Sequence, residues 1–331
     1  MASGDLLKQL FRNYKYGDSE SFEAVAWNIV DEEKQKNHHI LASELQRILS
    51  NGQIPRLNNS HMQPLPRDKE TDIELIEVRR SQKYLPDVIL ADEVKIQIER
   101  VLTEFCYSEV LRTYNMRPLS KLLFCGPPGC GKTLTAEVIA GELDLPILYT
   151  RFDSIISSLL GQTATNLRQV FEYAAQGQWV IFFDEFDAIG KSRDDSTEHG
   201  ELKRVVNTFL QLIDSFSSDN LIIASTNHQG LIDRALWRRF DDIIYFDIPT
   251  VEQIPDIIHR KLATFRHDSL RLNKNLLSKL DGFSYADIER LCFDAIKEAI
   301  LNHKNKISNL EFERSLERQL HRRIIVKNTS I

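Results

Sequence analysis

The sequence predicts an α/β fold, a doubly wound parallel sheet followed by a purely helical region. Short, nearly continuous apolar runs recur along the chain, as expected for parallel strands buried on both faces. These runs are Lys121–Cys125, Pro146–Tyr149, Trp179–Phe183, Leu221–Ala224 and Ile243–Ile248. Amphipathic helical stretches lie between them, notably 131–143, 163–176 and 201–215. After Pro249 the apolar runs stop and only helical periodicity follows, which favours a small helical domain at the end of the chain.

The N-terminal part of the sequence has a different character. Residues 5–50 show helical spacing of apolar side chains in three short segments, the last around Leu41 and Leu45. Such short helices bury little area alone, so we expect them to pack on one another or on a partner. Residues 51–70 are rich in Asn, Gly and Pro, which predicts a linker. The expected organisation is an N-terminal helical adaptor (1–50), a linker and pre-core segment (51–83), an α/β domain (84–249) and a helical lid (250–331).

The composition of the chain is that of a soluble globular protein, with 42% apolar and 27% charged residues. No apolar run is long enough to span a membrane, and the N-terminus lacks the features of a secretory signal. The four cysteines show no metal-binding spacing and suit a reducing compartment, so we expect a cytoplasmic protein. The net charge of −6 argues against nucleic-acid binding as the main function. The basic stretch Arg314–Lys327 is interpreted as the solvated face of a helix.

The strongest chemical motif is Gly126–Thr133, which fits the phosphate-binding pattern G-x-x-x-x-G-K-[ST] between a predicted strand and a predicted helix. Glycines allow backbone N–H groups to surround phosphates, and the start of a helix adds a favourable dipole. Lys132 is expected to contact the β- and γ-phosphates of ATP, and the Thr133 hydroxyl to bind Mg²⁺. The predicted nucleotide-binding residues of this loop are Pro128, Gly129, Cys130, Gly131, Lys132, Thr133 and Leu134.

Two acidic residues follow a later buried strand. Asp184 and Glu185 come directly after Val180–Phe183, at the strand end where α/β sheets place ligands. Asp184 is expected to hold Mg²⁺, and Glu185 to polarise the attacking water. Asn227 follows the next strand, where its amide could contact the γ-phosphate and this water; a turn-forming asparagine is the alternative.

Arg238 and Arg239 precede the last predicted strand. An arginine there could stabilise the charge that develops on a transferred γ-phosphoryl group, often from a neighbouring subunit. The alternative is a surface ion pair with Asp241 or Asp242.

With these motifs in order, residues 84–325 resemble the AAA family of AAA+ ATPases. The resemblance implies a P-loop core with a five-stranded parallel sheet in the order 5-1-4-3-2 and a helical lid. It also implies a homo-oligomeric ring, commonly a hexamer, in which Arg239 reaches the neighbour's ATP. Other members carry a second arginine where this chain has Asp242, and Arg238 is the candidate substitute.

The resemblance extends to further positions. It implies adenine contacts from Asp87, Val88 and Ile89, from His259, and from Tyr285 and Ala286 in a lid motif where Tyr285 replaces a glycine. For His259, a helix histidine without ligand contact is the alternative. Leu159 and Leu160 align with a central-pore loop in which an aromatic residue usually grips polypeptide. Leucine at position 159 lacks a ring, which weakens the inference of substrate threading.

A narrower resemblance concerns the biological role. The N-terminal helices followed by this core are similar to small bacterial AAA proteins encoded beside a subtilisin-like serine protease, pairs associated with plasmid incompatibility and phage defence. The leading hypothesis is therefore an ATPase that remodels or delivers a protein partner, such as this protease. The alternative is an ATP-dependent assembly switch that scaffolds an effector without threading it. A DNA-acting protein is disfavoured by the charge and by the lack of a DNA-binding module.

Overall fold

A computed structural model describes residues 4–16, 19–35, 64–68, 71–151, 155, 162–189, 199–216, 219–231, 234–263, 265, 270, 272–304 and 306–329. The chain divides into two compact units, Met1–Pro64 and Leu65–Ile331. In the first unit, helices α1 (Gly4–Tyr16) and α2 (Ser19–Gln35) pack against each other. Tyr14 contacts Phe22 with ring centroids 6.2 Å apart. The third predicted helix, around Leu41 and Leu45, lies outside the described residues.

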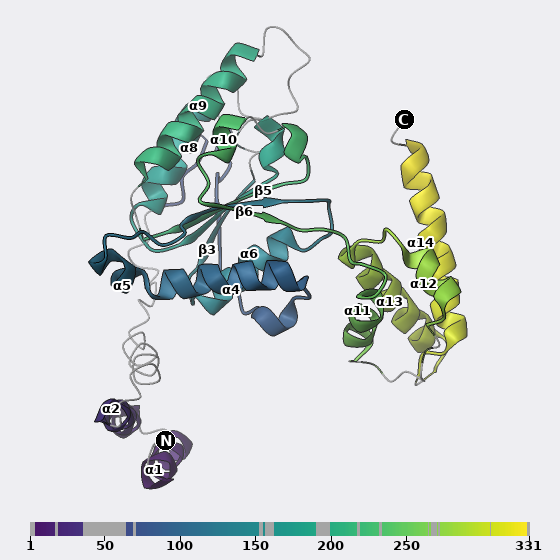
Figure 1. Cartoon of the computed structure of the whole chain (residues 1–331), viewed down its shortest axis with the longest axis horizontal. Helices are drawn as coiled ribbons and strands as arrows, with labels where there is room; N and C mark the ends of the chain where they lie inside the picture. Colours follow the sequence, from purple (N-terminus) through teal and green to yellow (C-terminus); the bar gives the residue numbers. More distant parts are fainter. Residues whose placement is uncertain are drawn as a thin grey trace. The chain divides into compact units, whose positions relative to one another are not determined.

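The second unit contains a six-stranded sheet in the order β1-β3-β4-β5-β2-β6 (Figure 1). Its strands are β1 (Glu77–Arg79), β2 (Lys121–Cys125), β3 (Ile147–Arg151), β4 (Val180–Asp184), β5 (Leu221–Thr226) and β6 (Asp242–Tyr245). All pairs among β2–β6 are parallel, whereas β1 is antiparallel to β3. The predicted α/β class is confirmed, but the sheet is mixed rather than wholly parallel. Apolar runs do not reveal β1, because Glu77-Val78-Arg79 contains a single apolar residue.

Helices cover both faces of this sheet (Figure 1). On one face lie α4 (Asp92–Cys106) and α6 (Lys132–Glu142), which bury Ile98 and Ile139 against Phe124, Phe182 and other strand residues. On the other face lie α8 (Thr163–Ala174) and α9 (His199–Ser215). There the Phe183 ring lies 5.6 Å from Phe171 and 5.2 Å from Phe209. Short elements complete this region: α5 (Ser108–Thr113), α10 (Arg234–Trp237) and the 3₁₀ turns Leu85–Asp87, Phe186–Ile189 and Gln229–Leu231.

The segment before β1 folds onto the core, although its first described residues, 64–68, fall within the predicted linker. Asp68 is buried and accepts hydrogen bonds from Thr71 and, at 2.7 Å, from the Asn166 side chain of α8. The Leu75 N–H also donates to the Pro66 carbonyl at 2.9 Å. The Pro-rich composition indicates an extended chain here, but a buried carboxylate with several donors holds the segment against the protein.

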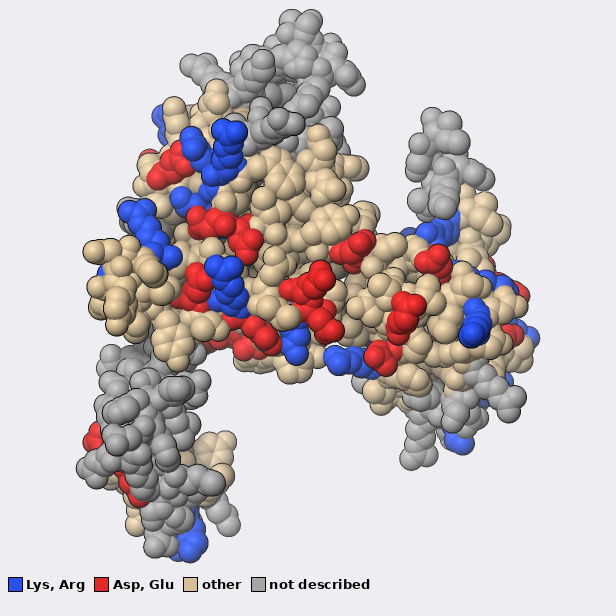
Figure 2. All heavy atoms as spheres, in the orientation of Figure 1, with Lys and Arg blue, Asp and Glu red and all other residues tan. Residues whose placement is uncertain are grey.

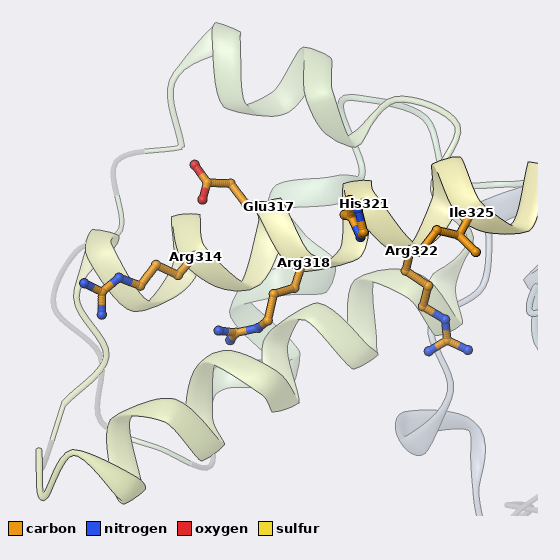
Figure 3. Close-up of a pocket in the computed structure, with 6 residues that line it drawn as sticks. All are labelled: Arg314, Glu317, Arg318, His321, Arg322 and Ile325. Carbon is orange, nitrogen blue, oxygen red and sulfur yellow. The ribbon is translucent and has the colours of Figure 1, made fainter.

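The described residues after Thr250 form the helices α11 (Ile254–Leu262), α12 (Lys274–Leu280), α13 (Tyr285–Leu301) and α14 (Asn309–Thr329). They enclose their own apolar cluster, which includes Ile258, Leu291 and Phe312. Figure 3 shows Arg314, Arg318 and Arg322 of α14 among the residues that line a pocket. Arg314 and Arg318 pair with Glu298 of α13, so these basic side chains have an intramolecular partner.

Lys, Arg, Asp and Glu are interspersed over the face of the molecule drawn in Figure 2. Within the described ranges, no helix combines the length and apolar character needed to cross a membrane.

The contacts of Glu311 on α14 predict that the helical region loses stability in acid. Its buried carboxylate pairs with Lys304 and accepts the Ser308 N–H at 2.9 Å. Burial raises its pKa, but these bonds outweigh burial and lower the pKa from 4.5 to about 2. Since the folded pKa is the lower one, the stabilisation is complete above pH 4.5 and is lost as the pH falls toward 2.

We expect Glu311→Gln to lower the melting temperature at pH 7, through a loss on the order of 1–3 kcal/mol, and to flatten its decline in acid. Thermal unfolding followed between pH 2 and pH 7 measures both effects. Glu313→Gln, an exposed site on the same helix, is the matched control. Identical curves for wild type and Glu311→Gln would contradict the assignment.

Candidate active site

Polar side chains meet where three neighbouring strands end. Side chains alternate between the faces of a strand, so Ile147 and Tyr149 of β3 share a face. The same holds for Phe182 and Asp184 of β4, and Ser225 lies on the same face of β5 as the buried Ile223. Because Phe183 pairs with Ala224, Ser225 lies opposite Asp184. The buried residues Ile147, Phe182 and Ile223 belong to the same apolar cluster as residues of α6. The polar side chains of Tyr149, Asp184 and Ser225 therefore lie on the α6 side of the sheet, at its carboxyl edge.

The glycine-rich loop follows β2 at the same edge. Gly126, Gly129 and Gly131 have φ angles of +137°, +77° and +93°, which residues other than glycine rarely adopt. A Cβ at Gly126 would also collide with the Phe246 carbonyl, so this position requires glycine for close approach as well. The loop ends at Lys132, where α6 begins without a side-chain cap. Its first backbone N–H groups are therefore available to an anion.

Lys132 lies inside the loop and is only 7% exposed. Its Nζ donates to the carbonyls of Gly126 at 2.7 Å and Pro127 at 2.9 Å. Burial lowers the pKa of this amine. Burial likewise raises the pKa of the nearby Cys125 and Cys130 thiols to about 11, so both stay neutral at pH 7. The loop thus contains a cation and no competing thiolate.

Asp184 is the centre of the hydrogen-bond network. Its Oδ2 accepts the Thr133 hydroxyl at 3.1 Å and the Tyr149 hydroxyl at 2.8 Å. Its Oδ1 accepts the Ser225 hydroxyl and the Glu185 N–H, the latter at 2.9 Å. A carboxylate and a hydroxyl brought together beside an uncapped helix N-terminus are oxygen donors of the kind that Mg²⁺ accepts, with substrate phosphates completing its ligands. The residues present therefore fit Mg²⁺.

Glu185 and Asn227 follow β4 and β5 at this edge. Glu185 is exposed and has φ +54°, an uncommon value for a residue with a side chain. The Asn227 N–H lies 3.3 Å from Oδ1 of the buried Asp187, and the Thr226 hydroxyl lies 3.4 Å from the same atom. These contacts hold the end of β5 beside the turn that follows β4.

The helical region reaches the loop through the start of α13. The Ala286 N–H donates to the Gly129 carbonyl at 3.0 Å. A Cβ at Gly129 would lie 2.8 Å from the Ser284 hydroxyl, so glycine permits this contact. Tyr285 packs against the apolar clusters of both the sheet and the helical region. Cys130, also in the loop, is buried.

The remaining predicted base contacts are more scattered. Val88 is buried, and Ile89 packs against the helical cluster. Asp87 accepts the Tyr84 N–H at 2.8 Å. His259 is exposed on α11.

Arg239 lies after α10 and pairs with Asp214 of α9, its Nε 2.9 Å from the carboxylate. For Arg239 the alternative of a surface ion pair is confirmed, but its partner is Asp214 and not Asp241 or Asp242. Asp241 instead accepts the N–H groups of Ser120 and Lys121 at 2.9 Å, and Asp242 accepts the Ile243 N–H. Arg238 is exposed. The predicted pore residues Leu159 and Leu160 lie outside the described residues.

Tyr149 and Ser225 bond to Asp184, and Asp187 contacts the end of β5, but motif reasoning identifies none of the three. A signal for the first two is present in the sequence. Counting by two along each apolar run places Tyr149 and Ser225 on the same sheet face as Asp184. The relative register of the strands, which sequence periodicity alone does not provide, is needed to bring them together.

Comparison with known proteins identifies related ATPases. Residues 122–248 match the family model described as ATPase family associated with various cellular activities (AAA). The chain is 40% identical over 327 residues to an uncharacterized AAA family ATPase of Sinorhizobium fredii, covering 98% of this chain and 97% of that protein. It is 31% identical over 266 residues to the peroxisomal ATPase pex6 of Schizosaccharomyces pombe, covering 75% of this chain and 28% of that protein. It is 34% identical over 218 residues to a proteasome-activating nucleotidase of Methanosphaerula palustris, covering 63% and 53%.

Proposed function

Because this chain belongs to the AAA family of ATPases, we propose that the residues around Asp184 form the site at which it hydrolyses ATP with Mg²⁺. One observation carries the proposal: Asp184 lies 51 positions after Thr133 in the sequence, yet its carboxylate accepts the Thr133 hydroxyl beside the loop that buries Lys132. A buried cation, an uncapped helix start and a hydroxyl–carboxylate pair are the groups that phosphoryl transfer requires.

Each residue then has a distinct role toward ATP. The backbone of Pro128–Leu134 surrounds the phosphates. Lys132 donates to phosphate oxygens in place of the loop carbonyls that it contacts without nucleotide. Thr133 and Asp184 hold Mg²⁺, which when bound neutralises charge on the phosphates. Glu185 accepts a proton from the attacking water, and Asn227 orients that water. Tyr285 and Ala286 of α13, with Asp87–Ile89 and His259, contact the base.

We further propose a homo-oligomeric ring, commonly of six subunits, in which Arg239 acts on the neighbour's ATP. Arg239 lies at the surface, with 46% of its side chain exposed. Surface pairs such as that with Asp214 contribute little stability, so a neighbour's phosphate could replace the carboxylate as partner. Arg238 is the second candidate cation because Asp242 replaces the second arginine of other members.

A protein partner is also part of the proposal. The pex6 and proteasome-activating relatives are named for peroxisomal and proteasomal systems. In this chain α1 exposes Phe11 at 71% and Tyr14 at 76%, which suits an adaptor segment (1–50) that docks a protein. A subtilisin-like serine protease and a role in phage defence are the specific partner and role suggested by the sequence resemblance. Residues 51–83 would then join this adaptor to the α/β domain (84–249) and the lid (250–331).

A complementation experiment tests both the site and the trans arginine. Lys132→Met and Arg239→Ala proteins are each expected to lose at least about 99% of ATPase activity, because each removes a cation from every active site. In a mixed ring, an interface between an intact loop and an intact Arg239 forms again. We therefore expect phosphate release to reappear on mixing and to peak near equal amounts.

Lys297→Met, an exposed lysine on α13, is the control for the lysine substitution and should behave as wild type. Activity that never exceeds the sum of the separate variants would contradict the trans role of Arg239. Full activity of the Lys132→Met protein would contradict the assignment of the site.

A further inference from the structure

Tyr149 is the one aromatic hydroxyl that the described structure shows on the Asp184 carboxylate, and no phosphate-binding motif includes it. We propose that Tyr149 is a positioning residue for the Mg²⁺ site: its hydroxyl holds the Asp184 carboxylate, and Arg79 of the edge strand holds its ring. The inference rests on the proposed function, since it concerns the carboxylate assigned to Mg²⁺.

The carboxylate needs a fixed orientation to act as a ligand. Thr133 and Tyr149 donate to the same oxygen, Oδ2, at 3.1 and 2.8 Å. The Thr133 hydroxyl is itself assigned to the metal, so it is a ligand and not a support that is independent of Mg²⁺. Tyr149 and Ser225 are side chains that can keep their bonds to Asp184, from β3 on one side of β4 and from β5 on the other. Such supporting hydrogen bonds orient ligands and tune metal affinity.

The ring of Tyr149 is held on more than one side. Its centroid lies 5.6 Å from that of Phe182, which belongs to the core. The Arg79 guanidinium lies over the ring, with Cζ 4.1 Å from its centroid. Arg79 in turn donates to Glu77 at 2.7 Å and lies 4.0 Å from the Glu137 carboxylate of α6. These contacts restrict the ring and therefore the position of its hydroxyl.

The short strand β1 contributes to the support of Tyr149. Glu77 pairs with Tyr149 in the antiparallel ladder, which places Arg79, two residues later, on the same face and within reach of the ring. Glu137 lies on the helix that begins at the phosphate-binding loop and pairs with Lys83 as well as with Arg79. Arg79 of the edge strand thus contacts both Tyr149, which supports Asp184, and α6, the helix that carries Lys132 and Thr133.

The test is the Mg²⁺ dependence of nucleotide binding by the full chain carrying Glu185→Gln, which prevents turnover. Binding of a fluorescent ATP analogue is measured in EDTA and across a MgCl₂ titration. Tyr149→Phe keeps the ring and its contacts with Arg79 and Phe182 but removes the hydroxyl. We expect the half-maximal Mg²⁺ concentration to rise about tenfold or more, while affinity in EDTA changes less than about twofold.

Tyr173→Phe is the matched control, since Tyr173 is a buried tyrosine of α8 whose ring contacts Trp179. It should show the Mg²⁺ dependence of the parent protein. Arg79→Leu removes the cation above the ring and should raise the Mg²⁺ requirement by a smaller factor than Tyr149→Phe. Melting temperatures measured in EDTA show whether each variant is folded.

An unchanged Mg²⁺ requirement in Tyr149→Phe would overturn the inference. Equal losses of affinity with and without Mg²⁺ would also overturn it, because they would reveal a packing effect on the loop. If the parent protein binds no ATP analogue under either condition, the proposed function fails and this inference fails with it.

Discussion

Glu185→Gln is expected to lower the rate of ATP hydrolysis by at least about 100-fold while leaving ATP binding intact. The amide retains the size of the side chain but cannot accept a proton from water. Glu185 is exposed at the carboxyl edge of the sheet and follows Asp184 directly, so its replacement leaves the network on Asp184 in place. The bond to Asp184 comes from the backbone N–H of residue 185, which the substitution keeps.

The measurement combines phosphate release with mass determination by light scattering, with and without Mg²⁺-ATP. Because bound ATP persists in this variant, a ring held together by Arg239 should accumulate, and the mass should rise to roughly six subunits. Glu172→Gln, an exposed glutamate on α8, is the control and should hydrolyse ATP at the wild-type rate. A monomer under both conditions would argue against the ring. A rate within about twofold of wild type would remove Glu185 from the role of base.

The elements that carry the phosphate chemistry could be predicted because their signals are local. The apolar run Lys121–Cys125 coincides with β2, and the loop and helix after it follow from the glycines and Lys132. Strand ends are less well predicted. The run Ile243–Ile248 corresponds to β6 at Asp242–Tyr245, because pairing with β2, not apolar content, determines where a strand ends.

The unpredicted parts depend on contacts between distant segments. β1 is a strand because Val78 pairs with Leu148, although its own sequence has little strand character. The partner of Arg239 is Asp214, 25 positions earlier in the sequence, whereas proximity in sequence favours Asp241 or Asp242. Asp241 is unavailable because it accepts backbone N–H groups at the start of β2. Such choices depend on how α9 and α10 pack, which periodicity within one segment does not specify.

Lys132→Met is expected to raise the dissociation constant for Mg²⁺-ATP at least about 100-fold, because it removes charge-assisted bonds to the phosphates. The side chain is 7% exposed, and its amine donates to the carbonyls of Gly126 and Pro127. In the protein without nucleotide, methionine removes the cost of burying a charge but leaves those two carbonyls without this donor. These effects oppose each other, so we expect the melting temperature without ATP to change only slightly.

The diagnostic quantity is therefore the rise in melting temperature on adding Mg²⁺-ATP. A ligand that binds the folded state stabilises it in proportion to the logarithm of its concentration over its dissociation constant. At a concentration about 100 times the wild-type constant this amounts to about 2.7 kcal/mol, and a 100-fold weaker site would retain about 0.4 kcal/mol of it. Lys297→Met should keep the full shift. A full shift in Lys132→Met would mean that the backbone of the loop alone holds the phosphates.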